Sequence, residues 1–132
     1  MRKIYILKGD GTKGDVYTFI QTSNIKIKKK FDFILRYIAD EKNQFKEPYV
    51  KHFTIEKYKQ FYELRLKVAK TMIRIIFCNV NEDILLLYAF VKRDKRDTEQ
   101  ALEHVLKLIE RIDIIDENEN NLMDYITEVD VY

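Results

Sequence analysis

The sequence has little of the chemistry that stabilises or activates many small proteins. Its 132 residues include one cysteine, Cys78, and two histidines, His52 and His104. A single thiol excludes an intramolecular disulfide, and two isolated histidines lack the spacing of a metal-ligand set. We therefore expect no cofactor and no metal in this protein, and we expect it to fold in a reducing cytoplasm.

Long apolar runs are absent as well. The first residues are basic, and the apolar run that follows them is only IYIL, at positions 4–7. No segment approaches the roughly 20 apolar residues that a membrane-spanning helix needs. The chain is 46% hydrophobic, which suffices for one compact core. The sequence therefore predicts a cytoplasmic, unexported protein with one domain and no membrane partner.

Basic residues are missing from the last part of the chain. All 24 lysines and arginines lie at or before Arg111, together with 15 of the 22 acidic residues, so residues 1–112 carry +9 and residues 113–132 carry −7. A basic body indicates a polyanionic partner, although scattered lysines also keep a protein soluble. We divide the chain into a domain at 1–112 and an acidic extension at 113–132, which either covers the basic surface or is a solvated tail.

Local patterns in the first half predict a strand and two helices. Residues 4–7 form the expected strand, and Asp15 and Asn24 are placed to cap two successive helices. The second helix has its apolar residues at spacings of three and four: Ile27, Phe31, Ile34, Leu35 and Ile38. Pro48 cannot continue a helix, so we interpret residues 40–53 as a loop that leads into a sheet.

The segment from Tyr62 to Arg93 predicts a three-stranded antiparallel meander. Apolar and polar residues alternate in FYELRLKV at 61–68, whereas TMIRIIFCNV at 71–80 and ILLLYAFV at 84–91 are nearly all apolar. Asp97 and Gln100 form a candidate capping box for a last helix that ends at Ile112. The expected class is α+β in the order β-α-α-β-β-β-α, and residues after 112 fit either a short helix or an edge strand.

Arg74 is the only charged residue inside its apolar segment. An arginine buried there costs several kcal/mol unless it is paired or reaches solvent, so either Glu63 neutralises it or it faces a ligand. Alternation places Arg65 on the outward face of the neighbouring strand, and pairing brings Lys92 and Arg93 towards the same patch. Guanidinium groups bind phosphate oxygens in bidentate fashion, so this patch suits a nucleic-acid backbone.

Other residues near the patch are candidates for RNA contacts. Lys67 and Lys95 add charge, and the aromatic side chains that could stack on an unpaired base are Tyr62, Tyr88 and Phe90. Histidine is a natural proton acceptor near neutral pH, but His52 lies in the predicted loop, where a surface role and an RNA contact both fit it.

The order of these segments resembles the phage-derived HigB-like branch of the RelE/ParE toxin superfamily. The resemblance spans residues 14–111 and rests on EPYVKHF at 47–53, ELR at 63–65, the strand at 73–77 and FVKR at 90–93 before a helix. It implies a RelE/ParE-like fold in which a helical hairpin packs on an antiparallel sheet. It also implies a type II toxin with a cognate antitoxin, acting as a metal-independent mRNA interferase that cleaves messenger RNA in the ribosomal A site.

The resemblance also implies roles for the basic residues. Arg65 matches a basic position on the second strand of that fold, and Arg74 matches the arginine that contacts the scissile phosphate. Arg93 matches the basic residue after the fourth strand, and Lys92 takes that place if the register slips by one.

Two positions depart from the pattern of RelE itself, which has a lysine where this chain has Glu63 and a tyrosine where it has Glu99. Cleavage by a ribose 2′-hydroxyl needs a base, a cationic clamp and an acid, and arginine can only clamp because it stays protonated. Lys92 is a candidate base because neighbouring cations favour its neutral form. A non-catalytic RNA- or protein-binding relative and a ParE-type gyrase inhibitor therefore stay open as alternatives.

Overall fold

The computed structural model describes residues 1–7, 15–117 and 126–130, and the side chains of residues 112–117 are not described. Its elements are β1 (Ile4–Leu7), α1 (Val16–Thr22), α2 (Ile25–Ala39), β2 (Val50–His52), the 3₁₀ helix η1 (Glu56–Tyr58), β3 (Phe61–Val68), β4 (Thr71–Val80), β5 (Asp83–Val91), α3 (Lys95–Glu117) and β6 (Ile126–Glu128). The predicted α+β class is confirmed. None of the described helices has the length and apolar character needed to cross a bilayer.

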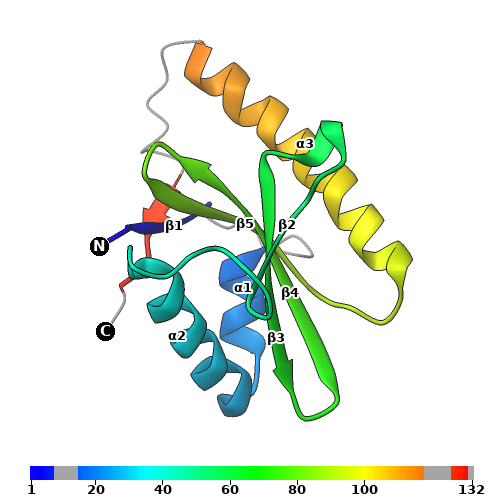
Figure 1. The fold of residues 1–132 in the computed structure, drawn as a ribbon. Coiled ribbons are helices and arrows are strands. Elements are labelled where there is room, and N and C mark those ends of the chain that lie inside the picture. Colours follow the sequence, from blue (N-terminus) through cyan, green and yellow to red (C-terminus); the bar gives the residue numbers. More distant parts are fainter. Residues whose placement is uncertain (8–14, 118–125, 131–132) are drawn as a thin grey trace.

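One sheet separates two helical layers (Figure 1). The strand order is β2-β3-β4-β5-β1-β6, and α1 and α2 pack on one face while α3 packs on the other. The meander formed by β3, β4 and β5 has the predicted strand bounds to within one residue. Its two turns place Ala69 and Asn81 in the left-handed region, with φ of 55° and 57°, as two-residue hairpin loops require.

The antiparallel sheet that the sequence predicts is in fact mixed, because β1 pairs with β5 in parallel while the other pairings are antiparallel. The chain leaves β1 and passes through α1 and α2 before the meander begins, so a later strand becomes the neighbour of β1. The loop expected at 40–53 contains β2, which pairs antiparallel with β3. A three-residue strand with two exposed side chains leaves almost no apolar pattern, which explains why the sequence did not indicate it.

The hydrophobic core has two halves because side chains alternate across the strands. The half facing α1 and α2 contains Leu64, Leu66, Ile73, Ile75 and Phe77. The half facing α3 contains Phe61, Ile76, Cys78, Leu85 and Leu87. Polar residues that alternate in phase with the second set must therefore lie on the face of the sheet that packs against α3.

The two predicted N-caps in the first half are confirmed. The Asp15 side chain accepts a hydrogen bond from the Thr18 amide at 3.1 Å, and Asn24 accepts one from the Ile27 amide at 3.0 Å. The capping prediction for α3 was misplaced, since the helix begins at Lys95 and Asp97 lies in its first turn. Asp97 accepts from the amides of Arg93 and Asp94 instead, which fixes the turn between β5 and α3.

Of the two structures that the sequence allowed after residue 112, the described residues show a strand, because Ile126 lies in β6 and not in the expected short helix. Helix α3 continues past Ile112 to Glu117, and β6 pairs antiparallel with β1, with Ile126 buried. The amphipathic pattern at Leu122 lies outside the described residues. Because β6 stands at the opposite edge of the sheet from β2 and β3, the described end of the extension does not cover the basic residues of β3. The division at residue 112 stays a prediction.

Candidate phosphate-binding site

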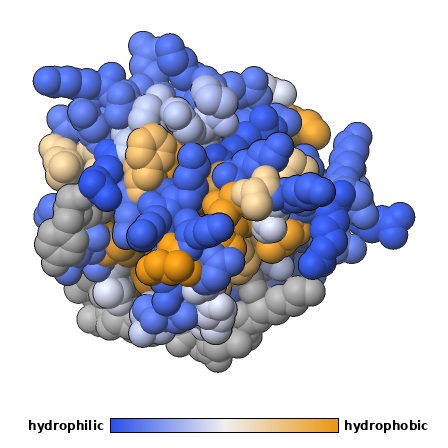
Figure 2. Space-filling model, turned by 90° about the horizontal axis from the view of Figure 1, so that it is seen from below, coloured by the Kyte–Doolittle hydropathy of each residue, from blue (hydrophilic) through white to orange (hydrophobic). Residues whose placement is uncertain are grey.

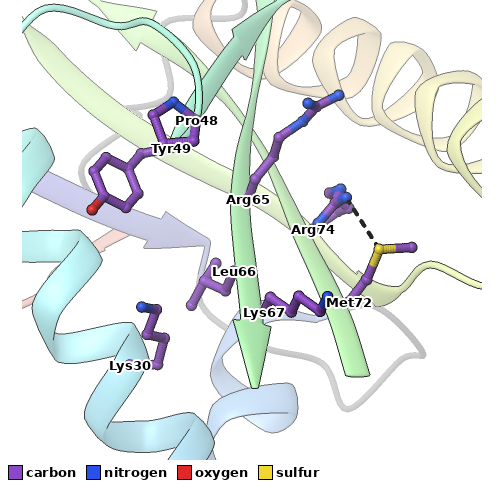
Figure 3. A pocket seen from close by; sticks show the side chains of 8 residues that line it. All are labelled: Lys30, Pro48, Tyr49, Arg65, Leu66, Lys67, Met72 and Arg74. Carbon is purple, nitrogen blue, oxygen red and sulfur yellow. Dashed lines mark hydrogen bonds between the residues drawn. The ribbon is translucent and has the colours of Figure 1, made fainter. Parts of the chain in front are cut away.

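Arg65 on β3 and Arg74 on β4 lie directly opposite each other across the two strands. Both are in phase with the residues that face α3, and their side chains project to the same side of the sheet (Figure 3). Two like charges opposite each other in a sheet repel and destabilise it. The pair therefore needs an anion close by.

Glu63 supplies that anion from two positions earlier on β3. Its Oε1 atom lies 3.2 Å from Nε of Arg65 and 3.5 Å from Nε of Arg74, and its side chain is only 1% exposed. One buried carboxylate thus serves two guanidinium groups: it accepts a hydrogen bond from Arg65 and forms an ion pair with Arg74, whose Nε has no hydrogen-bond partner among the described residues. The second oxygen, Oε2, has no hydrogen-bond partner among the described residues.

Arg74 is itself buried, with 8% of the residue exposed. Its Nη1 donates to the Ile73 carbonyl at 3.1 Å, and its Nη2 lies 3.8 Å from the Met72 sulfur. Burial lowers the pKa of Arg74 from its ordinary value, Glu63 raises it and Arg65 lowers it further. An arginine remains protonated at neutral pH in spite of such a shift, so the site keeps its positive charge.

Arg65 is the more accessible of the two arginines, with 25% of its side chain exposed. Its Nη1 lies 3.2 Å from Oε1 of Glu47, a side chain that is 67% exposed. The Arg65 amide donates to the Tyr49 carbonyl at 2.8 Å, so the segment before β2 runs beside β3 and brings Glu47 to the guanidinium. Sequence reasoning missed Glu47 because only the pairing of β2 with β3 reveals this neighbourhood.

A cavity of about 290 Å³ opens at these residues. It is lined by Lys30, Pro48, Tyr49, Arg65, Leu66, Lys67, Met72 and Arg74 (Figure 3). Four of these side chains are cationic, and among the described residues no acidic side chain lines the cavity. The volume lies just below the range of about 300–1,000 Å³ for ligand pockets, so the cavity suits one small anionic group with its attached ring.

The other predicted basic residues extend from this cavity towards α3. The Lys92 amide donates to the Met72 carbonyl at 2.8 Å, so the pairing of β4 continues past β5 and alternation places Lys92 on the face of Arg74. Arg93 and Lys95 are exposed where α3 begins. The structure thus brings Lys67 and Lys92 to the arginine face and leaves Arg93 and Lys95 at its border.

Tyr88 and Phe90 lie on the same face as the arginines. Phe90 is the direct partner of Arg74 in the register of β4 and β5, and the Tyr88 ring lies 5.9 Å from that of Phe90 and 4.8 Å from that of His104. Burial raises the pKa of Tyr88 above its ordinary value of 10.0, so its phenol stays protonated and available as a donor at neutral pH.

The structure does not bring His52 or Tyr62 to the arginines. Their rings stack at a centroid distance of 4.5 Å, and Tyr62 stacks in turn on Phe77, which belongs to the core half facing α1 and α2. His52 also contacts the Lys59 carbonyl through Nε2 at 2.6 Å. Both residues lie on the opposite face because strand alternation reverses the direction of neighbouring side chains.

The surface around the open end of the meander is mostly hydrophilic. Figure 2 views the molecule from below Figure 1, towards the end that holds the α1–α2 connection and the β3–β4 turn, and shows several hydrophobic patches among predominantly hydrophilic residues. Such a surface is suited to contacts with a charged, hydrated partner.

A comparison with family models matches residues 18–110 to the family described as "Phage derived protein Gp49-like (DUF891)". The chain belongs to this Gp49-like family. The matched range contains every residue of the site described above, and the family is known as related to RelE/HigB-like toxins. No curated protein and no solved structure matches the chain.

The resemblance seen in the sequence is therefore confirmed at the level of a phage-derived, toxin-related family. The HigB branch and the individual site roles remain predictions.

Proposed function

We propose that this Gp49-like protein is the toxin of a type II toxin–antitoxin pair and that it cleaves messenger RNA on the ribosome, as a member of the HigB-like branch. The observation that carries the proposal is the Arg65–Glu63–Arg74 arrangement at a cation-lined cavity. A carboxylate that fixes two guanidinium groups prepares them to bind a phosphodiester with little loss of side-chain entropy.

The reaction that fits this site is attack of a ribose 2′-oxygen on the adjacent phosphorus. The P–O5′ bond breaks, the leaving 5′-oxygen takes up a proton from water, and the products are a 2′,3′-cyclic phosphate and a 5′-hydroxyl. The partly exposed guanidinium of Arg65 and the ammonium of Lys67 neutralise charge that develops on the phosphoryl oxygens, while Arg74 supports them from the buried side.

The proton of the 2′-hydroxyl needs an acceptor, and Glu47 is the carboxylate best placed for it. Glu47 is exposed and lies 3.2 Å from Arg65, so a phosphate bound to Arg65 takes the place of its present contact and leaves the carboxylate beside the sugar. A carboxylate accepts this proton more readily than a protonated lysine, so we rank Glu47 above Lys92 as the base. Lys92, Arg93 and Lys95 then serve to hold the RNA backbone.

Induction of the wild-type chain and of Arg65→Gln in bacterial cultures tests the proposal. The wild type should stop growth and create new 5′ ends in cellular transcripts, and Arg65→Gln should do neither. Arg111→Gln, the same change at an exposed position of α3, is the matched control and should behave as the wild type. Arg65 is a better probe than Arg74, because Arg74 is buried and its replacement would also destabilise the fold.

The same experiment separates the alternatives. Growth arrest without new 5′ ends identifies a non-catalytic binder, and DNA damage without RNA cleavage identifies a gyrase inhibitor. Equal growth of the wild-type and Arg65→Gln cultures contradicts a toxin function that depends on this site.

A further inference from the structure

The cavity at Arg65 extends beyond the sheet face that packs against α3. Arg65, Lys67 and Arg74 belong to that face, whereas Leu66 is in phase with the core half facing α2, and Lys30 comes from α2 itself. The cavity therefore curves around the edge of β3. Among the described residues, the β2–β3 ladder ends at the Val50–Leu64 pair, and one further hydrogen bond joins the Arg65 amide to the Tyr49 carbonyl, so this edge is unpaired from Leu66 onward.

The Tyr49 ring lines the far end of the cavity and packs against two other aromatic rings. The Tyr49 ring lies 4.8 Å from that of Tyr37 and 5.7 Å from that of Phe33, measured between centroids, and Lys30 Nζ lies 5.2 Å from the Phe33 centroid. Tyr49 is half-buried and Phe33 is 43% exposed. Because its neighbours hold the Tyr49 ring, a flat ligand that stacks there loses little of the protein's side-chain freedom.

The two ends of the cavity differ in what they can bind. Three cations line the end on the α3 face, and an aromatic ring with one lysine lines the other end (Figure 3). A nucleotide has the same division, because its phosphate is anionic and its base has an apolar π-face. Stacking on an aromatic side chain contributes about 1–3 kcal/mol per base and tolerates any sequence.

We propose that Tyr49 forms a nucleobase subsite, in which the base of the nucleotide whose phosphate binds Arg65 stacks at the α2 end of the cavity. The subsite rests on the proposed RNA function. It requires the bound RNA to be single-stranded where it crosses the edge of β3. Lys30 contacts the next phosphate or a base oxygen, so its role is charge rather than stacking.

Binding of short oligomers to the full-length protein tests this subsite. The probes are a fluorescent single-stranded RNA of a few nucleotides and an abasic ribose-phosphate oligomer of the same length. We expect Tyr49→Leu to weaken binding of the RNA roughly 10-fold and to leave binding of the abasic oligomer unchanged. Tyr49→Phe keeps the ring and should bind both probes as the wild type does.

Arg65→Gln separates this inference from the proposed function, because it should weaken binding of both probes. If Arg65→Gln weakens both while Tyr49→Leu weakens both equally or neither, the base subsite is refuted and the phosphate site stands. If Arg65→Gln changes neither affinity, the proposed RNA function itself fails. If Tyr49→Leu does not fold, Phe33→Ala takes its place, because it removes an exposed ring that orders Tyr49. Weaker binding of the RNA with unchanged binding of the abasic oligomer then supports the subsite, and equal binding of both probes refutes it.

Discussion

Replacement of Glu63 by glutamine is the sharpest test of how the site is held together. Glutamine keeps the size of the side chain and removes its charge, so Arg74 and Arg65 lose their shared counter-ion. Glu63 is 1% exposed and the Arg74 side chain 10%, which makes this a buried ion pair. Removal of one partner from such a pair costs about 3–5 kcal/mol, because an uncompensated charge stays buried.

The contact of Glu63 with Arg65 adds little to that cost. Arg65 is 25% exposed and keeps Glu47 as a partner, and partly exposed pairs contribute at most about 1 kcal/mol. We therefore expect Glu63→Gln to lower the free energy of unfolding by about 3–5 kcal/mol, out of a typical total of about 5–15 kcal/mol. In urea, this loss shifts the midpoint of unfolding by roughly 2 M.

Equilibrium unfolding in urea measures the effect, with Glu110→Gln as the matched control. Glu110 is exposed on α3, so its replacement should change stability by less than about 0.5 kcal/mol. A double-mutant cycle with Arg74→Met should give a coupling energy above about 1 kcal/mol. In the Glu63→Gln protein the charge of Arg74 stays buried without a counter-ion, and Arg74→Met removes that charge. A Glu63→Gln protein as stable as the Glu110→Gln control refutes the reasoning.

Four further changes test other parts of the structure. Glu47→Gln should leave stability nearly unchanged and slow RNA cleavage about 10²–10⁴-fold, measured in single turnovers; an unchanged rate removes Glu47 as the base. Lys67→Gln should weaken RNA binding at all sequences and reduce the slope of log affinity against log salt by roughly 0.7, and an unchanged slope places Lys67 outside the interface. Hydrogen bonds from Lys57, the larger cause, and from Tyr58 lower the pKa of Glu103 below its ordinary value of 4.5. The stability that this contact contributes is therefore fully present above pH 4.5 and is lost as the pH falls through the folded-state pKa of Glu103. The difference in melting temperature between the wild type and Glu103→Gln should accordingly shrink as the pH is lowered from 6 to about 3; a constant difference assigns the contact to packing alone. Ile126→Ala should cost about 2–4 kcal/mol in urea unfolding because Ile126 of β6 is buried between the sheet and α3, and a neutral result separates β6 from the core.

The meander was predictable because its strands carry their own pattern. Tyr62, Leu64, Leu66 and Val68 alternate with charged residues, and a register shift by one position would expose all of them, so the sequence determines which face each residue takes. The opposition of Arg65 and Arg74 follows from that pattern and from a two-residue turn.

The parts that sequence reasoning missed depend on contacts between distant segments. The parallel pairing of β1 with β5 needs no local signal, since any apolar strand can take that place. Glu47 looks like one more charged loop residue until β2 pairs with β3 and brings it to Arg65. His52 lies in a strand and not in a loop, and alternation then directs it away from the arginines.

The central claim is that the arginines fixed by Glu63 bind messenger RNA for cleavage on the ribosome. The most direct measurement is cleavage of a defined messenger RNA on purified, programmed ribosomes, with the fragments separated by length. Wild-type protein should produce fragments with new 5′-hydroxyl ends, and Arg111→Gln should match it. Arg65→Gln should produce at most a few per cent of that cleavage, which is the loss expected when a transition-state contact of about 2–4 kcal/mol is removed. Intact messenger RNA with the wild-type protein, or equal cleavage by Arg65→Gln, would contradict the claim.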